Sequence, residues 1–358
     1  MAKKSGDKNL LDDYIKLIDN PYADLAENGT IADISGYVDT GSYALNALFS
    51  GDIYLGMPQN HVNCFAGEQT TGKTYFCLDI ARNFLKGNEN AVVVIFDTES
   101  AIKKKMLLER GMPLNRVMIA PVETIQEFKT QALKIIKKHI ANDDPNKPKL
   151  MVILDSLGML STTKEMADSE SGNQVKDMTK AAEIKAAFRT LTLPASKADI
   201  PIIITNHVYA LVGSYVPMKE MGGGSGLKYA ANNIIFLSKK KEKDGDEVVG
   251  NVIHCKGVKL RDTRQDKEVD VLLRYDSGLD RYYGLLDIAI KHNIFKKVEK
   301  RIQLPNGTTE FESRINKNPE KYFTKDVLDL INAACKKEFL YGSATADDVE
   351  QVDFAEDE

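Results

Sequence analysis

One eight-residue motif constrains the fold of this chain more than any other part of its 358 residues. Residues 67–74 read GEQTTGKT and match the pattern G-x-x-x-x-G-K-[ST]. A short strand-like run precedes the motif, and apolar residues at helical spacing follow it. Glycines in such a loop let backbone N–H groups surround an anion, and the positive end of the following helix adds attraction. The motif therefore predicts a strand, a phosphate-binding loop and a helix, in that order.

Apolar runs of strand length alternate with helical segments along the middle of the chain. Buried strands of parallel sheets read as continuous apolar runs and are joined by helices, so this alternation predicts an α/β fold with a mostly parallel central sheet. Besides the elements around the motif (strand 61–66), the predicted strands are 91–96, 150–154, 202–205, 234–237, 252–255 and 269–273, and the predicted helices are 102–110, 125–140 and 175–193.

The pattern changes near both ends of the chain and predicts four regions. They are a polar N-terminal segment (1–37), a core (38–283), a small C-terminal α/β lobe of two helices around a basic hairpin (284–340), and an acidic tail (341–358). Residues 347–358 carry seven acids and no base, so the net charge of −4 becomes −4 + 7 = +3 without them. Such a tail is expected to be disordered. It is either a solubilising end or a competitor for a basic surface, and both readings stay open.

Composition excludes membrane and secreted classes. The longest strongly apolar runs have about six residues, too few for a transmembrane helix, and the first residues lack the apolar core of a signal peptide. The four cysteines show no CxxC spacing, which favours free thiols in a reducing compartment over zinc or disulfides. We therefore expect a cytoplasmic protein without a membrane partner.

Three charged residues and a threonine carry the predicted phosphate chemistry. In the motif, Lys73 can reach the β- and γ-phosphates and Thr74 offers a hydroxyl to Mg²⁺. Asp155 ends the apolar run 150–154 and is the second predicted metal ligand, because strand carboxyl ends face the nucleotide crevice in such sheets. Glu99 follows the run 91–96 and is placed to orient the attacking water, with Asp97 in support. The alternatives, a solvated Glu99 and a surface Asp155, stay open.

ATP is the predicted nucleotide. The guanine-binding pattern N-K-x-D is absent, because neither Asn-Lys pair of the chain is followed by that aspartate. The Leu-Ser-Gly-Gly-Gln element of ABC proteins is absent as well. We therefore expect ATP and Mg²⁺ as the ligands of the loop.

Two segments that follow strand ends are candidates for contacting DNA. The helix at 175–193 has an apolar stripe (Ala181, Ile184, Phe188 and Leu191) with basic residues on both sides, although a core-facing helix with solvated flanks would read the same way. The second segment, 208–221, follows Asn206 and His207 and mixes apolar and aromatic residues before a glycine run, which suits threading between unpaired bases. The candidate DNA-binding residues are Lys176, Lys180, Lys185, Arg189, Tyr209, Tyr215, Met218, Lys219, Gly222, Gly223 and Gly224.

Several short motifs occur together in a fixed order. They are DTGSYALN at 39–46, the loop at 67–74, FDTE at 96–99, ILDSLG at 153–158, DMTK at 177–180, Phe188-Arg189, Asn206-His207, GGGSGLKY at 222–229 and YGLLD at 283–287. With these motifs the chain resembles the RecA-type recombinases, and among them most closely the UvsX recombinases of T-even-type phages. The resemblance covers about residues 38–290.

The resemblance implies a RecA-like P-loop NTPase core and a short N-terminal oligomerisation segment. It also implies an ATP-dependent helical filament of this chain on single-stranded DNA that pairs homologous duplex DNA and exchanges strands, in recombination, repair and recombination-dependent replication. A loading mediator and a single-strand-binding protein are implied partners, and the host cytoplasm is the implied location if a phage encodes the chain.

The resemblance also assigns roles to residues. Glu99, Lys73 and His207 are the implied catalytic residues, with His207 in the place of a glutamine of bacterial RecA. Cations of a neighbouring subunit would complete each ATP site. The implied nucleotide-binding residues are Gly67, Glu68, Gln69, Thr70, Thr71, Gly72, Lys73, Thr74, Tyr75, Asp155 and, stacked on adenine, Tyr275, and the implied neighbour contacts are Lys256, Lys259, Arg261 and Lys228.

Two other functions stay open. A hexameric helicase with the same core would form closed rings and translocate along DNA. A binding-only accessory protein would cap or load a recombinase without turning over ATP, although the presence of Lys73, Glu99 and Asp155 speaks against it.

Overall fold

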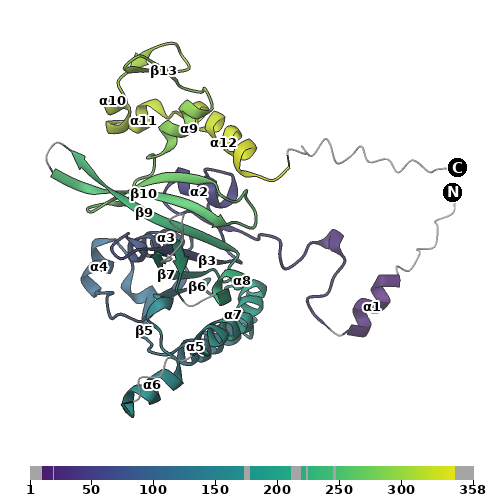
Figure 1. Ribbon diagram of the computed structural model, residues 1–358. Coiled ribbons are helices and arrows are strands. Elements are labelled where there is room, and N and C mark those ends of the chain that lie inside the picture. The colour runs from purple at the N-terminus through teal and green to yellow at the C-terminus, as the bar shows by residue number, and fades with distance from the viewer. Residues whose placement is uncertain are drawn as a thin grey trace, which may run out of the picture.

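A mixed sheet of ten strands forms the centre of the molecule, in a computed structural model that describes residues 10–18, 20–172, 178–210, 219–222, 225–244 and 247–342 (Figure 1). The strand order is β12-β11-β10-β9-β3-β7-β6-β4-β5, with β8 paired to β7. The strands from β9 to β5 run parallel, whereas β10, β11, β12 and β8 join antiparallel. The bounds are β3 Val62–Gly67, β4 Val92–Asp97, β5 Val117–Pro121, β6 Leu150–Asp155, β7 Ile202–Ala210, β8 Lys219–Met221, β9 Asn233–Asp244, β10 Glu247–Lys259, β11 Glu268–Arg274 and β12 Gly278–Leu279.

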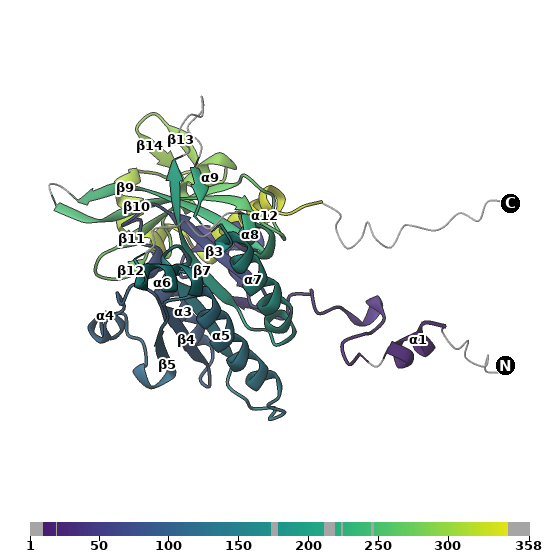
Figure 2. The same cartoon turned by 60° about the horizontal axis from the view of Figure 1, so that its bottom comes forward.

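Helices cover both faces of this sheet (Figure 2). One face packs on α2 and α3, and the other packs on α5 and α7, in two separate apolar clusters. Because successive side chains of a strand point to opposite faces, a parallel strand covered on both faces is mostly apolar, as β4 and β6 are. The parallel strands, with helices on both faces, confirm the predicted α/β class. The helices of the core are α2 Tyr43–Ser50, α3 Lys73–Gly87, α4 Lys104–Glu109, α5 Ile125–Ile140, α6 Thr163–Glu170, α7 Lys180–Lys197 and α8 Ser225–Ala230.

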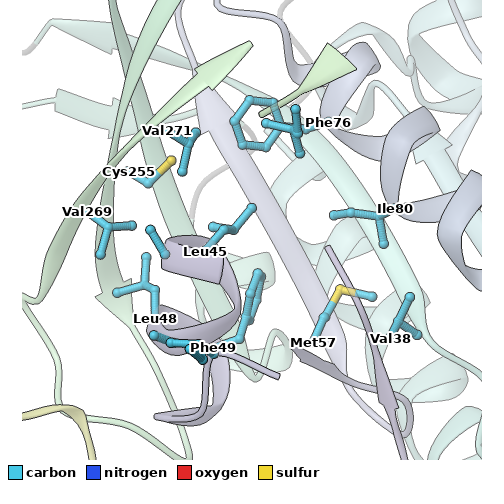
Figure 3. Packing of buried hydrophobic residues seen from close by; sticks show 14 of the residues in the cluster. Val38, Leu45, Leu48, Phe49, Met57, Phe76, Ile80, Cys255, Val269 and Val271 are labelled. Atoms are coloured by element: carbon cyan, nitrogen blue, oxygen red, sulfur yellow. The ribbon is translucent and has the colours of Figure 1, made fainter. Parts of the chain in front are cut away.

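The helix α2 joins the antiparallel part of the sheet to the parallel part. Leu45, Leu48 and Phe49 of α2 are fully or almost fully buried, and they pack between β11 and the helix α3 (Figure 3). Ser42 caps the start of α2 by accepting a hydrogen bond from the backbone N–H of Leu45. This packing holds the antiparallel strands β10 and β11 in place beside the phosphate-binding loop.

The N-terminal segment stands apart from this body. The helix α1, Leu10–Ile18, lies away from the rest of the molecule in both views (Figures 1 and 2). Its apolar side chains Leu11, Tyr14, Leu17 and Ile18 are all more than half exposed. The segment then reaches the core through β1, Tyr37–Val38, which pairs with β2, Met57–Pro58.

The C-terminal lobe shares its core with the central sheet. Phe295, Ile302, Phe323 and Ile331 belong to the same apolar cluster as α2 and α3. Besides the two predicted helices and the predicted hairpin, the lobe contains a third strand and two short helices. Its elements are α9 Leu285–Lys291, β13 Lys296–Val298, β14 Arg301–Gln303, β15 Thr309–Glu310, α10 Glu312–Lys317, α11 Pro319–Tyr322 and α12 Lys325–Phe339.

Several predicted boundaries were wrong. The strands β9 and β10 have 12 and 13 residues, whereas the apolar runs predicted only four each. Beyond the apolar runs, β9 and β10 continue through charged residues and pair with each other, with Glu247 opposite Asp244. The strand β5 and the helix α6 were not predicted, and α7 begins at Lys180 rather than at residue 175.

Two expectations from the composition can be compared with the described part of the chain. No helix there is both long and apolar enough to cross a membrane. The four cysteines are free and buried, as the absence of CxxC spacing predicted. The acidic tail lies outside the described residues from residue 343 onward.

Candidate nucleotide-binding site

The predicted phosphate-binding loop joins β3 to α3. Gly72 precedes the first helical residue with a φ of 88°, and a Cβ at this position would lie 2.5 Å from Leu273. Glycine is therefore required for the backbone to turn into the helix this close to β11. The Nζ of Lys73 donates hydrogen bonds to the carbonyl oxygens of Gly67 at 3.1 Å and Glu68 at 2.8 Å, which holds the loop closed. Burial lowers the pKa of Lys73, against the opposing effect of Asp155 and Glu99.

Asp155 lies at the carboxyl end of β6, beside the start of α3. Its Oδ2 accepts a hydrogen bond from the Thr74 hydroxyl at 2.6 Å, and its Oδ1 accepts one from the hydroxyl of Thr205 in β7. Burial raises the pKa of Asp155, while these two hydrogen bonds lower it. A carboxylate and a hydroxyl in contact are hard oxygen donors of the kind Mg²⁺ prefers, so Thr74 and Asp155 fit the predicted metal site.

Glu99 sits on a loop that Asp97 shapes. Asp97, at the end of β4, accepts hydrogen bonds from the backbone N–H groups of Glu99 at 3.1 Å, Ala101 at 3.3 Å and Ile102 at 3.1 Å. These bonds turn the chain just after the strand and direct Glu99 toward the edge where β6 ends. Asp97 therefore supports the site rather than facing it.

Glu99 and Ser156, which follow β4 and β6, meet His207 of β7, a strand that continues to Ala210. The Ser156 hydroxyl donates a hydrogen bond to Glu99 Oε1 at 2.9 Å, and His207 Nε2 lies 3.6 Å from the same oxygen. Ser156 Oγ and His207 Nε2 are 3.5 Å apart. The Glu99 side chain is 40% exposed and that of His207 is 14% exposed, so both face an opening rather than the core.

That opening is a pocket of about 650 Å³ at the carboxyl ends of the parallel strands. Its lining includes the charged residues described above and four apolar or aromatic side chains, those of Tyr75, Met106, Leu273 and Tyr275. Gly67, Glu68 and Thr71 belong to the loop but not to the lining, and the Thr71 hydroxyl donates to the Glu68 carbonyl at 2.9 Å. The predicted residues that line the pocket are Gln69, Thr70, Gly72, Lys73, Thr74, Tyr75, Glu99, Asp155, His207 and Tyr275.

Sequence reasoning missed several residues of this pocket. The Nζ of Lys239 donates to the carbonyl of Thr70 at 2.8 Å and to its hydroxyl at 2.6 Å. Lys239 belongs to a run of lysines that reads as solvent-facing. Leu237 of β9 pairs with Gly67 of β3, and Lys239 follows Leu237 by two residues in the same strand. The register of these two strands would therefore have placed Lys239 beside the phosphate-binding loop. The other lining residues that were not predicted are Ala101, Met106, Arg110, Asn251, Leu273 and Arg274.

The strand β7 continues from the pocket into the second candidate DNA segment. Asn206 Nδ2 donates to the Gly222 carbonyl at 2.9 Å, and the Gly222 N–H donates to the His207 carbonyl at 3.0 Å. Val208 and Met221, which open and close that segment, are only 6% and 3% exposed and belong to the core, so they are not available to DNA. Tyr209 is 59% exposed.

The helix α7 partly follows its predicted stripe. Ile184, Phe188 and Leu191 are buried, but Ala181 is exposed and the stripe continues instead through Ala187. Lys185 and Arg189 are exposed, Lys180 Nζ lies 3.4 Å from Glu165 Oε2, and Lys185 Nζ lies 5.6 Å from the ring centre of Tyr229. Outside the described residues lie Lys176, Tyr215, Met218, Gly223, Gly224 and the side chain of Lys219.

The four candidate neighbour contacts do not line this pocket. Lys256 Nζ lies 3.3 Å from Glu268 Oε1 and 3.4 Å from Asp266 Oδ1. Lys259 Nζ donates to the Lys228 carbonyl at 2.7 Å, and Lys228 Nζ lies 3.2 Å from Glu220 Oε1. The Arg261 N–H donates to Asn233 Oδ1 at 3.1 Å.

A phosphate-binding loop between a strand and a helix, with Asp155 at the carboxyl end of another strand of the same sheet, defines a P-loop nucleoside triphosphatase core. Residues 23–280 match the RecA N-terminal domain family, and the chain belongs to this family. The resemblance to the RecA-type family that the motifs indicated is thereby confirmed.

Individual relatives agree with that assignment. The chain is similar to the recombination and repair protein of Enterobacteria phage T4, with 29% identity over 247 residues, 69% of this chain and 61% of that protein. It is also similar to Protein RecA of Chlorobium limicola, with 28% identity over 263 residues, and of Paracoccus denitrificans, with 26% over 308 residues. These matches cover 73% and 82% of this chain, and 71% and 81% of the two bacterial proteins. The match thus spans less than two thirds of the phage relative's length.

Proposed function

We propose that the protein is a DNA-dependent ATPase that forms helical filaments on single-stranded DNA and exchanges strands with homologous duplex DNA. Recombination, repair and recombination-dependent replication are the processes that need this activity. The observation that carries the proposal is the meeting of Glu99, Ser156 and His207 beside the phosphate loop, because His207 leads directly into the β7–β8 segment. Membership in the RecA family supports the proposal, as does the similarity to a phage recombination and repair protein.

In this function the pocket binds ATP by its triphosphate. The backbone N–H groups of the loop and the start of α3 attract the phosphate oxygens. Lys73 exchanges its hydrogen bonds to the Gly67 and Glu68 carbonyls for contacts to the β- and γ-phosphates. Thr74 and Asp155 would hold Mg²⁺, which when bound neutralises charge on the phosphates.

The side chains at the strand ends carry out hydrolysis. The Glu99 carboxylate orients the attacking water and accepts its proton, while the hydrogen bond from Ser156 keeps the carboxylate in place. Phosphoryl transfer needs mainly positioning and charge stabilisation, so this set of residues is sufficient when cations surround the γ-phosphate.

His207 links the nucleotide to DNA. Its side chain lies 3.6 Å from Glu99 Oε1, and its carbonyl accepts the hydrogen bond from Gly222 at the far end of the β7–β8 segment. We propose that a contact of His207 with the γ-phosphate orders the 208–221 segment on the DNA. Loss of the γ-phosphate removes this contact and weakens DNA binding.

Assembly and hydrolysis are coupled in this proposal. Lys256, Lys259, Arg261 and Lys228 lie outside their own chain's pocket. In a filament the three lysines would leave their present partners to reach the site of a neighbouring subunit. A cation supplied by a neighbour is worth about 10³-fold or more in rate. The exposed apolar side chains of α1 support an oligomerisation role for residues 1–37. A loading mediator and a single-strand-binding protein are further proposed partners, and the cytoplasm, that of a host if a phage encodes the chain, is the proposed location.

One pair of measurements tests this function against its alternatives. We expect ATP turnover that single-stranded DNA stimulates, and open helical filaments in electron micrographs with ATP and single strands. Closed rings in the same micrographs would indicate a helicase instead. An absence of DNA-stimulated turnover would indicate a binding-only accessory protein.

A further inference from the structure

A buried carboxylate beside the nucleotide pocket has no part in the proposed mechanism. Asp79, on the second turn of α3, is fully buried. Its Oδ1 accepts a hydrogen bond from Arg110 Nη1 at 2.7 Å and lies 3.4 Å from Arg82 Nη1, and its Oδ2 accepts one from the Leu279 N–H at 2.9 Å. A carboxylate buried this deeply is tolerable only with such partners, so Asp79 holds Arg110 and the end of the β11–β12 turn in fixed positions.

Arg110 is thereby fixed in the pocket wall. Its guanidinium carbon lies 4.4 Å from the ring centre of Tyr75, and its side chain is 8% exposed. Gly278 has a φ of 86°, and a Cβ there would lie 2.6 Å from Arg110 Nη1, so the backbone also closes on this edge of the group. Within the described residues Nη1 is the one atom of this guanidinium with a hydrogen bond, which leaves the donors of Nε and Nη2 for a ligand.

The position of Arg110 identifies the part of ATP that it meets. In the proposed function Lys73 and the loop bind the phosphates, and Thr74 and Asp155 would hold Mg²⁺. Met106, Leu273 and Tyr275 line the same pocket as Arg110, and Gly278, against which Arg110 packs, follows Tyr275 by three residues. The Tyr275 hydroxyl accepts a hydrogen bond from Asn251 at 3.4 Å. An apolar and aromatic wall suits a planar base. Arg110 is the charged donor fixed at this wall by a buried acid.

We propose that Arg110 is a specificity-determining residue of the ATPase. An N–H of Nε or Nη2 donates a hydrogen bond to a ring nitrogen of adenine, while Nη1 stays on Asp79 and the Tyr75 ring keeps the guanidinium plane in place. The inference rests on the proposed function, since it names how the same site reads the base of its nucleotide.

Deaza analogues of ADP test this contact, because each replaces one ring nitrogen with C–H and none is hydrolysed. The full chain is titrated with ADP and with 1-, 3- and 7-deaza-ADP in competition with a fluorescent ADP, with Mg²⁺ and without DNA. We expect one analogue to bind about tenfold more weakly than ADP and the other two to bind within about twofold, as loss of one charge-assisted hydrogen bond requires.

Variants then assign the effect to Arg110. Arg110→Ala and Arg110→Lys should bind ADP and that analogue equally, since a lysine ammonium held by Asp79 has no second arm to reach the base. The Lys variant keeps a charge beside Asp79, so it answers the question if the Ala variant unfolds. Arg82→Ala removes the other cation of Asp79, which is not in the pocket lining, and should keep the tenfold difference.

The outcomes separate two failures. If the wild type binds ADP but all three analogues bind as ADP does, or if both Arg110 variants keep the difference, the role of Arg110 is wrong and the ATPase stands. If the wild type does not bind ADP, the proposed function itself is wrong and the role of Arg110 falls with it.

Discussion

Two groups of buried polar side chains lie at opposite ends of the central sheet. At the carboxyl ends of the parallel strands, Asp155 is bonded to Thr74 and Thr205 and faces the nucleotide pocket. At the amino ends, Asn233 Nδ2 donates to Asn63 Oδ1 at 2.9 Å, and His61 Nδ1 lies 3.4 Å from Asp262 Oδ2.

The two groups differ in access and in charge. His61 is 4% exposed and the amino-end asparagines are fully buried, and burial lowers the pKa of His61 to about 4, with help from Arg261. His61 is therefore neutral near pH 7, and the group closes the base of the sheet. The carboxyl-end group borders a loop of inward N–H groups and a helix start, which compensate a bound anion. Buried polarity alone thus does not define a site, and the phosphate loop makes the difference.

The largest effect expected from this comparison concerns Lys73. Lys73→Ala should lower DNA-stimulated ATP turnover by about 10³-fold and abolish strand exchange with it, because the cation that reaches the β- and γ-phosphates is lost. His61→Asn, at the other end of β3, should leave turnover unchanged and serves as the matched control. Normal strand exchange by Lys73→Ala would contradict the coupling of ATP to DNA pairing.

The second largest effect is expected from a substitution of Glu99. Glu99→Gln keeps the shape of the side chain and its hydrogen bond from Ser156 but removes the base, so hydrolysis should slow by about 10²-fold or more. ATP-dependent binding to single strands should persist. Single-turnover hydrolysis and filter binding with the same preparation measure both, and an unchanged rate would remove Glu99 from its role.

His207 should affect coupling more than hydrolysis. In His207→Ala, the affinity for single strands with ATP should fall about tenfold toward the affinity with ADP, because the γ-phosphate loses its link to the β7–β8 segment. His207→Gln retains a donor of similar reach and should restore most of the difference. Affinities are compared over a salt series, since phosphate contacts make them fall steeply with salt. Equal ATP dependence in wild type and His207→Ala would show that the link runs elsewhere.

The carboxyl-end residues were predictable because they follow a local rule. Asp155, Glu99 and His207 each end or follow an apolar run, and parallel strands bring such positions to one edge. Lys239 and Arg110 could not be found in this way, because they reach the pocket from the charged extension of β9 and from the end of α4. Ser156 also follows the run 150–154, but the sequence does not show that its hydroxyl bonds to Glu99.

The fold shows the same division between local and tertiary signals. The run at 125–140 predicted α5 to the residue, because its apolar face repeats with helical spacing. The sequence placed Ala181 in the apolar stripe and Val208 and Met221 in a DNA-contacting segment, whereas Ala181 is exposed and the other two are buried. The exposure of a side chain depends on which elements cover it, and the local sequence pattern does not contain that information.

The smallest expected effect on activity, but a measurable one on stability, belongs to the amino-end group. The pKa of His61 is about 4 in the folded chain and about 6.5 when unfolded, so the unfolded chain binds a proton in this window that the folded chain does not. The free energy of unfolding therefore falls as the pH falls, by about 2 kcal/mol from this residue between pH 7.5 and pH 5. Urea unfolding of wild type and His61→Asn at both pH values measures that amount, since groups that do not contact His61 cancel in the difference. Asp262 lies 3.4 Å from His61 and its raised pKa acts in the opposite sense, and the Asn replacement keeps a polar neighbour beside it. An identical loss in both proteins would mean that His61 is charged inside the fold, and the contrast between the two ends of the sheet would then disappear.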